Sequence, residues 1–219
     1  MSVKIKICGL STPETLAAAL SEGADFVGLV HFPKSPRYVG PIAASALAGQ
    51  ARGKARIVSL VVDAGDTLLD EIVANVRPDY LQLHGSETPE RVAEIVGRWQ
   101  VPVIKAVKVA NAADAATADC YREVAGLILF DAKPLPGESA KLPGGNGIAF
   151  DWHAIAGEAE KGPFMLSGGL NAGNVAEAIR LTGAPMVDVS SGVETAPGKK
   201  DVALIRGFIS VVRARQRAT

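Results

Sequence analysis

Cysteine is scarce in this chain, which has only two among its 219 residues, Cys8 and Cys120. Two cysteines so far apart give no disulfide framework of the kind that stabilises small secreted domains. The sequence therefore predicts a protein of a reducing compartment, the cytoplasm.

Net charge is lacking too, because 23 lysine and arginine residues balance 23 aspartate and glutamate residues. The chain offers no basic field for nucleic acid and no polybasic patch for a membrane surface. No apolar run approaches the roughly 18 residues of a transmembrane helix. Lys4 and Lys6 also interrupt the apolar stretch that a signal peptide requires. We expect no nucleic-acid partner and no membrane association.

What the sequence has in plenty is hydrophobic residues, 48% of the total, which is enough for a sizeable core. No linker or shift in composition marks a domain boundary. One α/β barrel takes about 200–250 residues, so we expect a single domain over residues 1–219.

The most informative stretch is VKIKICGL at Val3–Leu10, where apolar residues alternate with Lys4, Lys6 and Cys8. Period-two alternation is typical of a β-strand, and it places Lys6 and Cys8 on one face. Gly9 allows a turn, and Ser11 and Thr12 before a proline predict the N-cap of a helix. The thiol is thus expected at the end of a strand, beside a cation.

The same strand-then-helix order repeats along the chain. Further strands are expected at Ala24–Phe32, Arg56–Val62, Asp79–Gly85, Val101–Val109, Gly126–Lys133, Pro163–Leu170 and Pro185–Glu194. Helices are expected at Pro13–Glu22, Ile42–Ala51, Thr67–Val76, Thr88–Trp99, Ala112–Val124, Phe150–Ala159, Ala172–Leu181 and Asp201–Arg217. About eight such units predict an α/β fold, a closed (βα)₈ TIM barrel of parallel strands.

In such a barrel the active site lies at the C-terminal ends of the strands. Those ends carry Cys8, His31, Asp63, His84, Lys105 or Val107, Asp131, Gly168–Gly169 and Ser190–Gly192. Several polar residues share a strand face in pairs, such as Gln82 with His84, so we expect this face to point to the barrel axis. Buried charges must be paired, so Lys6, Lys105 and Asp188 are expected to form a layer of ion pairs beneath the site.

Two glycine-rich runs, SGGLNAGN and SSGVETAPG, follow the last two strands. Glycine lets backbone N–H groups approach an anion, and a short helix after the last strand would add its dipole. In barrels these two loops are the usual phosphate pocket, so the sequence predicts a phosphorylated ligand.

Seven segments together resemble the phosphoribosylanthranilate isomerase family of tryptophan biosynthesis. They are KICGL (Lys6–Leu10), FPKSPRYV (Phe32–Val39), LQLHG (Leu81–Gly85), FDAK (Phe130–Lys133), FDW (Phe150–Trp152), LSGGLN (Leu166–Asn171) and VDVSSGVE (Val187–Glu194). The resemblance covers essentially the whole chain. It implies an Amadori rearrangement of N-(5-phosphoribosyl)anthranilate to 1-(2-carboxyphenylamino)-1-deoxyribulose 5-phosphate, without metal or organic cofactor.

The resemblance also implies roles for individual residues. Asp131 is the expected general acid, Cys8 the expected general base, and Arg37 the group that holds the anthranilate carboxylate. The phosphate is expected on the backbone amides around Gly168, Gly169, Ser191 and Gly192. Lys6 is our hypothesis for the cation that favours the Cys8 thiolate. Gln82 and His84 are candidate pocket residues without an assigned role.

Two alternatives remain at this point. One is another phosphosugar barrel isomerase or epimerase, whose metal-dependent form would draw ligands from residues such as His31, Asp63 and His84. The other is a catalytically silent barrel that binds a phosphorylated ligand. A departure from the family also stands in the loop GGNG (Gly144–Gly147), where Asn146 replaces the usual hydroxyl residue. Monomer and homodimer are both open, as is activity on the related histidine-pathway aminoaldose.

Overall fold

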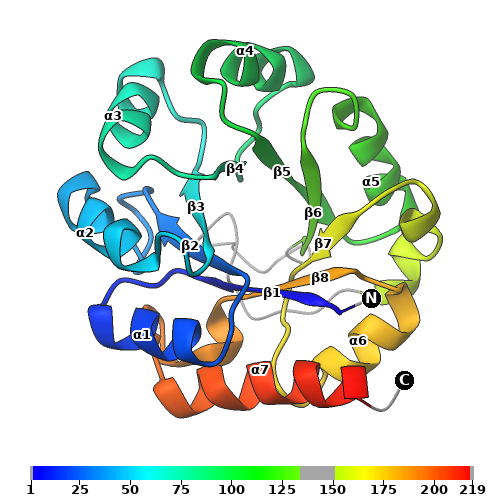
Figure 1. Ribbon diagram of the computed structural model, residues 1–219. Helices are drawn as coiled ribbons and strands as arrows, with labels where there is room; N and C mark the ends of the chain where they lie inside the picture. The colour runs from blue at the N-terminus through cyan, green and yellow to red at the C-terminus, as the bar shows by residue number, and fades with distance from the viewer. Residues whose placement is uncertain (1, 134–150, 218–219) are drawn as a thin grey trace.

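The barrel is confirmed by a computed structural model that describes residues 2–133 and 151–217. Eight parallel strands close in the order β1 to β8, and β1 pairs with β8 (Figure 1). The strands are β1 (Lys4–Cys8), β2 (Phe26–Val30), β3 (Arg56–Val61), β4 (Tyr80–Leu83), β5 (Val103–Val109), β6 (Leu127–Ala132), β7 (Phe164–Leu166) and β8 (Met186–Val189).

Helices surround the barrel (Figure 1). They are α1 (Pro13–Ser21), α2 (Pro41–Ala51), α3 (Asp66–Val76), α4 (Pro89–Trp99), α5 (Ala112–Ala116), α6 (Val175–Thr182) and α7 (Val202–Arg217). Thr12 caps α1 as predicted, since its side chain accepts from the Thr15 amide and Pro13 stands in the first turn. No helix in the described part of the chain is both long and apolar enough to cross a membrane.

Three expected elements differ most from the structure. The helix expected at Ala112–Val124 ends at Ala116 and continues as the 3₁₀ helix η1 (Thr117–Tyr121). The strand expected at Pro185–Glu194 ends at Val189, and the 3₁₀ helix η4 (Ser191–Val193) follows it. Where a helix was expected from Phe150 to Ala159, the described part holds the 3₁₀ helices η2 (Trp152–Ile155) and η3 (Glu158–Glu160).

Alternate residues of each strand serve two separate cores. The barrel interior holds one apolar cluster that includes Phe26, Val58, Ile104, Leu129 and Met165, and a smaller one that includes Cys8. Residues of the opposite parity, such as Ile5 and Ile7, belong to the larger core shared with the helices. This alternation decides which polar side chains reach the barrel interior and which lie beneath the helices.

Candidate active site

Cys8 ends β1 inside the barrel, with 4% of its surface exposed. Gly28 is its register partner on β2, and a Cβ at position 28 would lie 2.9 Å from Cys8 Sγ. Gly28 therefore leaves the space that the thiol occupies. Gly9 follows with a φ of 78°, which is the turn that the sequence predicted.

Lys6 lies two residues before Cys8 on the same face, and its Nζ donates to Asp188 Oδ1 at 2.9 Å. Both side chains are buried, and the predicted ion pair between them is confirmed. Burial alone would lower the pKa of Lys6, but the Asp188 carboxylate outweighs it and holds that pKa above its ordinary value.

The field around the thiol has more contributors than Lys6. Burial raises the pKa of the Cys8 thiol above its ordinary value. Lys6 lowers the pKa of the thiol, as we expected, but Asp188 raises it, and Lys200 is a second cation that lowers it. The thiol form of Cys8 is thus favoured in the substrate-free protein.

Asp131 stands at the C-terminal end of β6, with 3% of its surface exposed. Its Oδ2 lies 3.1 Å from His84 Nε2, and His84 Nδ1 lies 2.9 Å from Gln82 Nε2. The tautomer with the ring proton on Nε2 would accept from Gln82 at Nδ1 and donate to Asp131. Within the described residues, Gln82 Oε1 has no hydrogen-bond partner.

The expectation that Lys105 joins the inner ion pairs is wrong. Lys105 aligns with Leu83 and Ile128, which belong to the core beneath the helices. Its Nζ donates to Glu87 Oε2 at 2.8 Å, and it lies 5.5 Å from the centre of the Tyr121 ring. Lys105 therefore anchors the loop after β4 from outside the barrel.

The three candidate ligands of a metal-dependent enzyme have separate partners. His31 Nε2 lies 3.1 Å from Ser59 Oγ, on the outer face of the barrel. Asp63 accepts from the Ser86 amide, and His84 contacts Asp131. Among the described residues, no three His, Cys, Asp or Glu side chains are grouped in a way that could hold a metal ion.

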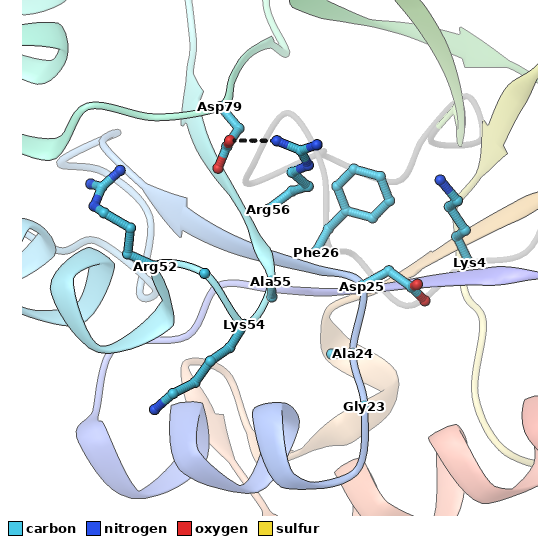
Figure 2. Close-up of a pocket in the computed structure, with 11 residues that line it drawn as sticks. Lys4, Gly23, Ala24, Asp25, Phe26, Arg52, Lys54, Ala55, Arg56 and Asp79 are labelled. Carbon is cyan, nitrogen blue, oxygen red and sulfur yellow. Dashed lines mark hydrogen bonds and ion pairs between the residues drawn. The ribbon is translucent and has the colours of Figure 1, made fainter.

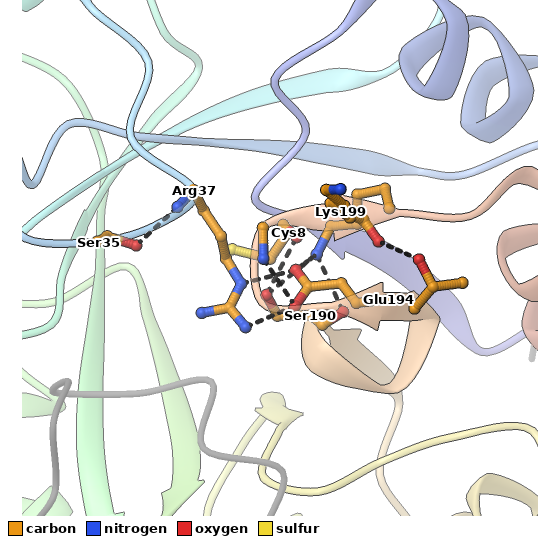
Figure 3. Close-up of polar contacts among 9 residues, drawn as sticks. Cys8, Ser35, Arg37, Ser190, Glu194 and Lys199 are labelled. Carbon is orange, nitrogen blue, oxygen red and sulfur yellow. Dashed lines mark hydrogen bonds and ion pairs between the residues drawn. The ribbon is translucent and has the colours of Figure 1, made fainter.

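Arg37 is buried rather than an exposed loop arginine. Its Nε donates to Glu194 Oε1 at 2.7 Å and its Nη2 to Glu194 Oε2 at 2.8 Å, as Figure 3 shows. Glu194 begins β9 (Glu194–Ala196), which forms a short hairpin with β10 (Lys199–Lys200). Burial by itself would raise the pKa of Glu194, but the hydrogen bond from Arg37 and the charge of Lys200 hold it below its ordinary value.

The two glycine-rich loops touch at their backbones. A Cβ at Gly192 would lie 1.9 Å from the Leu170 carbonyl oxygen. Gly168 and Gly169 both have a positive φ, and within the described residues their amides donate to no backbone or side-chain acceptor. Ser191 and Gly192 open η4, where helix amides have no intrahelical acceptor. Four backbone donors are therefore gathered at one end of the barrel.

A pocket of about 500 Å³ lies at the opposite end (Figure 2). It is lined by residues at the starts of strands, among them Lys4, Phe26 and Arg56. Its acidic groups are paired, because Arg56 contacts Asp79 at 3.0 Å and Asp25 contacts Arg213 at 2.8 Å. Neither Cys8 nor Asp131 reaches this end, so we place the candidate active site at the other.

Sequence reasoning missed two residues of the site, Glu194 and Lys200. Glu194 is the last residue of the segment VDVSSGVE, and Lys200 follows within a stretch that periodicity assigns to a loop. The signal available in the sequence was that two charged residues, Glu194 and Lys200, follow Ser191 and Gly192 within a few positions. The loop GGNG with Asn146 lies outside the described residues.

The family model for N-(5'-phosphoribosyl)anthranilate isomerase matches residues 5–211. This chain belongs to that family. A relative in Parvibaculum lavamentivorans named N-(5'-phosphoribosyl)anthranilate isomerase is 53% identical over 218 residues, covering 100% of both chains.

Solved structures of phosphoribosyl anthranilate isomerases share the fold. One from Thermotoga maritima is 37% identical with a TM-score of 0.86, covering 97% of this chain and 99% of its own. Another, in complex with reduced 1-(o-carboxyphenylamino)-1-deoxyribulose 5-phosphate, is 35% identical with a TM-score of 0.83 and the same coverage. The isomerase family is thus supported by sequence and fold over the full chain.

Proposed function

We propose that this protein converts N-(5'-phosphoribosyl)anthranilate to 1-(2-carboxyphenylamino)-1-deoxyribulose 5-phosphate, a step of tryptophan biosynthesis. The observation that carries the proposal is the position of Cys8 and Asp131, both buried at the C-terminal end of one barrel. The reaction needs one acid and one base and no net oxidation. A family match over the whole chain supplies the substrate.

The first step uses the carboxyl group of Asp131. Its proton passes to the furanose ring oxygen, the bond between that oxygen and C1 breaks, and the nitrogen lone pair forms a C1=N iminium. His84 holds Oδ2 through its Nε2, so Oδ1 is the oxygen that carries the transferable proton. His84 acts here on the orientation of the acid rather than on the substrate.

The second step uses the thiolate of Cys8. It removes the proton from C2, the electrons of that bond form C1=C2, and the iminium nitrogen recovers its lone pair. The resulting enolamine tautomerises to the C2 ketone. Burial disfavours the thiolate, and the iminium's positive charge near C2 offsets part of that cost once the ring has opened.

The remaining residues bind the two ends of the substrate. The guanidinium of Arg37 suits the planar anthranilate carboxylate, because a fork of N–H groups matches two carboxylate oxygens. The amides of Gly168, Gly169, Ser191 and Gly192 suit the phosphate. The acid and base then lie between these two anchors.

The decisive experiment follows the fluorescence decay of freshly made phosphoribosylanthranilate with the purified wild type, Cys8→Ser and Asp131→Asn. We expect rapid decay with the wild type and near-complete loss in both variants. Cys120→Ser and Asp119→Asn are matched controls, since both residues are exposed, and they should keep full activity.

Each other outcome has a definite meaning. A wild type without activity that still binds a product analogue would overturn the proposal in favour of a silent binder. Wild-type activity lost on metal chelation would favour the metal-dependent alternative. Activity that survived in Cys8→Ser or Asp131→Asn would remove that residue from its role.

A further inference from the structure

A buried cluster of charges joins the hairpin β9–β10 to the site. Lys200 Nζ lies 2.6 Å from Glu194 Oε1, the same oxygen that accepts from Arg37 Nε at 2.7 Å. The side chains of Lys200 and Glu194 are 1% and 3% exposed. The buried Glu194 carboxylate therefore contacts two cations, Lys200 and Arg37, away from solvent.

The hairpin is seated firmly on the loop that carries Arg37. A Cβ at Gly198 would lie 2.3 Å from the Pro36 carbonyl oxygen, and the Gly198 amide donates to Glu194 Oε2 at 3.3 Å. On the other side, a Cβ at Gly9 would lie 2.7 Å from Arg37 Cδ. These contacts fix the cluster against the end of β1, where the thiol stands.

Lys200 also reaches the strand end through Ser190. Its Nζ donates to the Ser190 carbonyl at 2.9 Å, and Ser190 Oγ donates to the Cys8 carbonyl at 3.3 Å. Figure 3 shows Cys8, Ser190 and Glu194 grouped beside Arg37. The ammonium thus lies between the carboxylate that holds Arg37 and the residue that carries the thiol.

Charged groups surround Cys8 from several elements: Lys6 on β1, Arg37 after β2, Asp188 on β8, and Glu194 and Lys200 on the hairpin. Lys6 has Asp188 as its own counter-charge. Among the described residues, the acidic partner of Lys200 is the Glu194 carboxylate that it shares with Arg37, and burial lowers the pKa of Lys200 despite that contact. A thiolate at Cys8 would supply the negative charge that this environment lacks.

We propose that Lys200 is a positioning residue that links the base to the carboxylate anchor, stabilising the Cys8 thiolate while holding Glu194 against Arg37. The assignment rests on the proposed function, since it gives Cys8 and Arg37 their roles. It predicts that removing the Lys200 charge weakens the base and loosens the anchor together.

The test is the titration of Cys8 in a Cys120→Ser background, read from the NMR chemical shift of the cysteine β-carbon. Lys200→Met should raise the titration midpoint by about one pH unit, as expected for the loss of a nearby opposite charge. Lys200→Arg should restore most of the parent midpoint. Lys199→Met is the matched control, because its side chain is exposed on the same hairpin, and its midpoint should not move.

A second variant gives a shift of opposite sign. Glu194→Gln removes the counter-charge of Lys200, so the midpoint of Cys8 should fall below that of the parent. This variant keeps the proposal testable if Lys200→Met does not fold. An unchanged midpoint in either variant, with intact folding, would overturn the proposal.

Kinetics provide the readout that a purely structural role would not move. The rise of kcat/KM with pH should shift upward in Lys200→Met by the same amount as the thiol midpoint, and KM should increase. A KM increase without a shift of the pH profile would reduce Lys200 to a support for Arg37 and overturn its link to the base. The NMR titration needs no turnover, so failure of the isomerase assignment would be recognised separately.

Discussion

Arg37 and Glu194, 157 positions apart, meet through two hydrogen bonds that use both carboxylate oxygens. Arg37 lies in the loop after β2 and Glu194 lies in the hairpin after β8, so the pair holds these two segments together. Held at both carboxylate oxygens of Glu194, the planar guanidinium has a fixed orientation, which suits the proposed anchor for a substrate carboxylate.

If Arg37 has its proposed role and contacts the substrate carboxylate equally in the ground and transition states, Arg37→Ala should raise KM more than it lowers kcat. Arg37→Lys keeps the charge without the fork and should recover only part of the affinity. Steady-state kinetics check both. Lys34→Ala, an exposed position in the same loop, is the control. An unchanged KM in Arg37→Ala would remove Arg37 from the substrate site.

His84→Gln should lower kcat about tenfold with little change in KM, because it frees the Asp131 carboxyl without touching either anchor. His153→Gln, at an exposed histidine, should leave kcat unaltered. The measurement is kcat at saturating substrate for the two variants. A His84→Gln enzyme with wild-type kcat would contradict the orienting role.

Lys6→Met should destabilise the fold by about 3–5 kcal/mol, because it leaves the buried Asp188 carboxylate without its partner. Lys4→Met, at the exposed start of the same strand, should cost far less. Urea unfolding measures both. Because the pKa of Lys6 is raised, its contribution is complete below its ordinary pKa of about 10.5 and is lost only as the pH rises further. A Lys6→Met loss below about 1 kcal/mol would argue against the pair.

Acid should weaken the fold through His31. Burial lowers the pKa of His31 to about 4 from an ordinary 6.5. Between these two pH values, His31 is protonated in the unfolded chain but neutral in the folded protein. Stability should therefore fall as the pH drops from 6.5 to 4, by up to about 3 kcal/mol. His31→Gln should flatten this part of the curve, measured by urea unfolding at a series of pH values. An identical slope in both proteins would contradict this assignment.

The barrel was predictable because its signals are local. Period-two alternation located β1, short apolar runs located the other seven strands, and Thr12 with Pro13 located the start of α1. The end of α5 was not predictable in this way. The Thr117 hydroxyl donates to the Asp114 carbonyl at 2.6 Å, and the chain there tightens into η1, an outcome that alanine-rich composition does not signal.

The site was predictable where polar residues shared a strand face, as Lys6 and Cys8 do. Strand parity did not predict which lysine of β5 faces the barrel interior. Lys105 and Lys108 lie on opposite faces of this strand, and the sequence pattern alone does not distinguish the two faces. Strand parity makes no prediction for Glu194 and Lys200, because they lie on a two-stranded hairpin outside the barrel sheet. Their roles depend on tertiary packing against Arg37.

The ion pair that closes the barrel also sets an order of assembly during synthesis. Lys6 and Asp188 are 182 positions apart, so a ribosome makes the buried lysine long before its counter-charge. Chains emerge N-terminus first at about 5–20 residues per second, which separates the two by roughly ten to forty seconds. Until β8 has been synthesised, β1 has no neighbouring strand on that side. Burying the Lys6 ammonium without the Asp188 carboxylate would be unfavourable. β1, which carries the Cys8 thiol, is therefore among the last strands to be paired on both sides. In chains truncated before β8, the barrel should remain open beside β1.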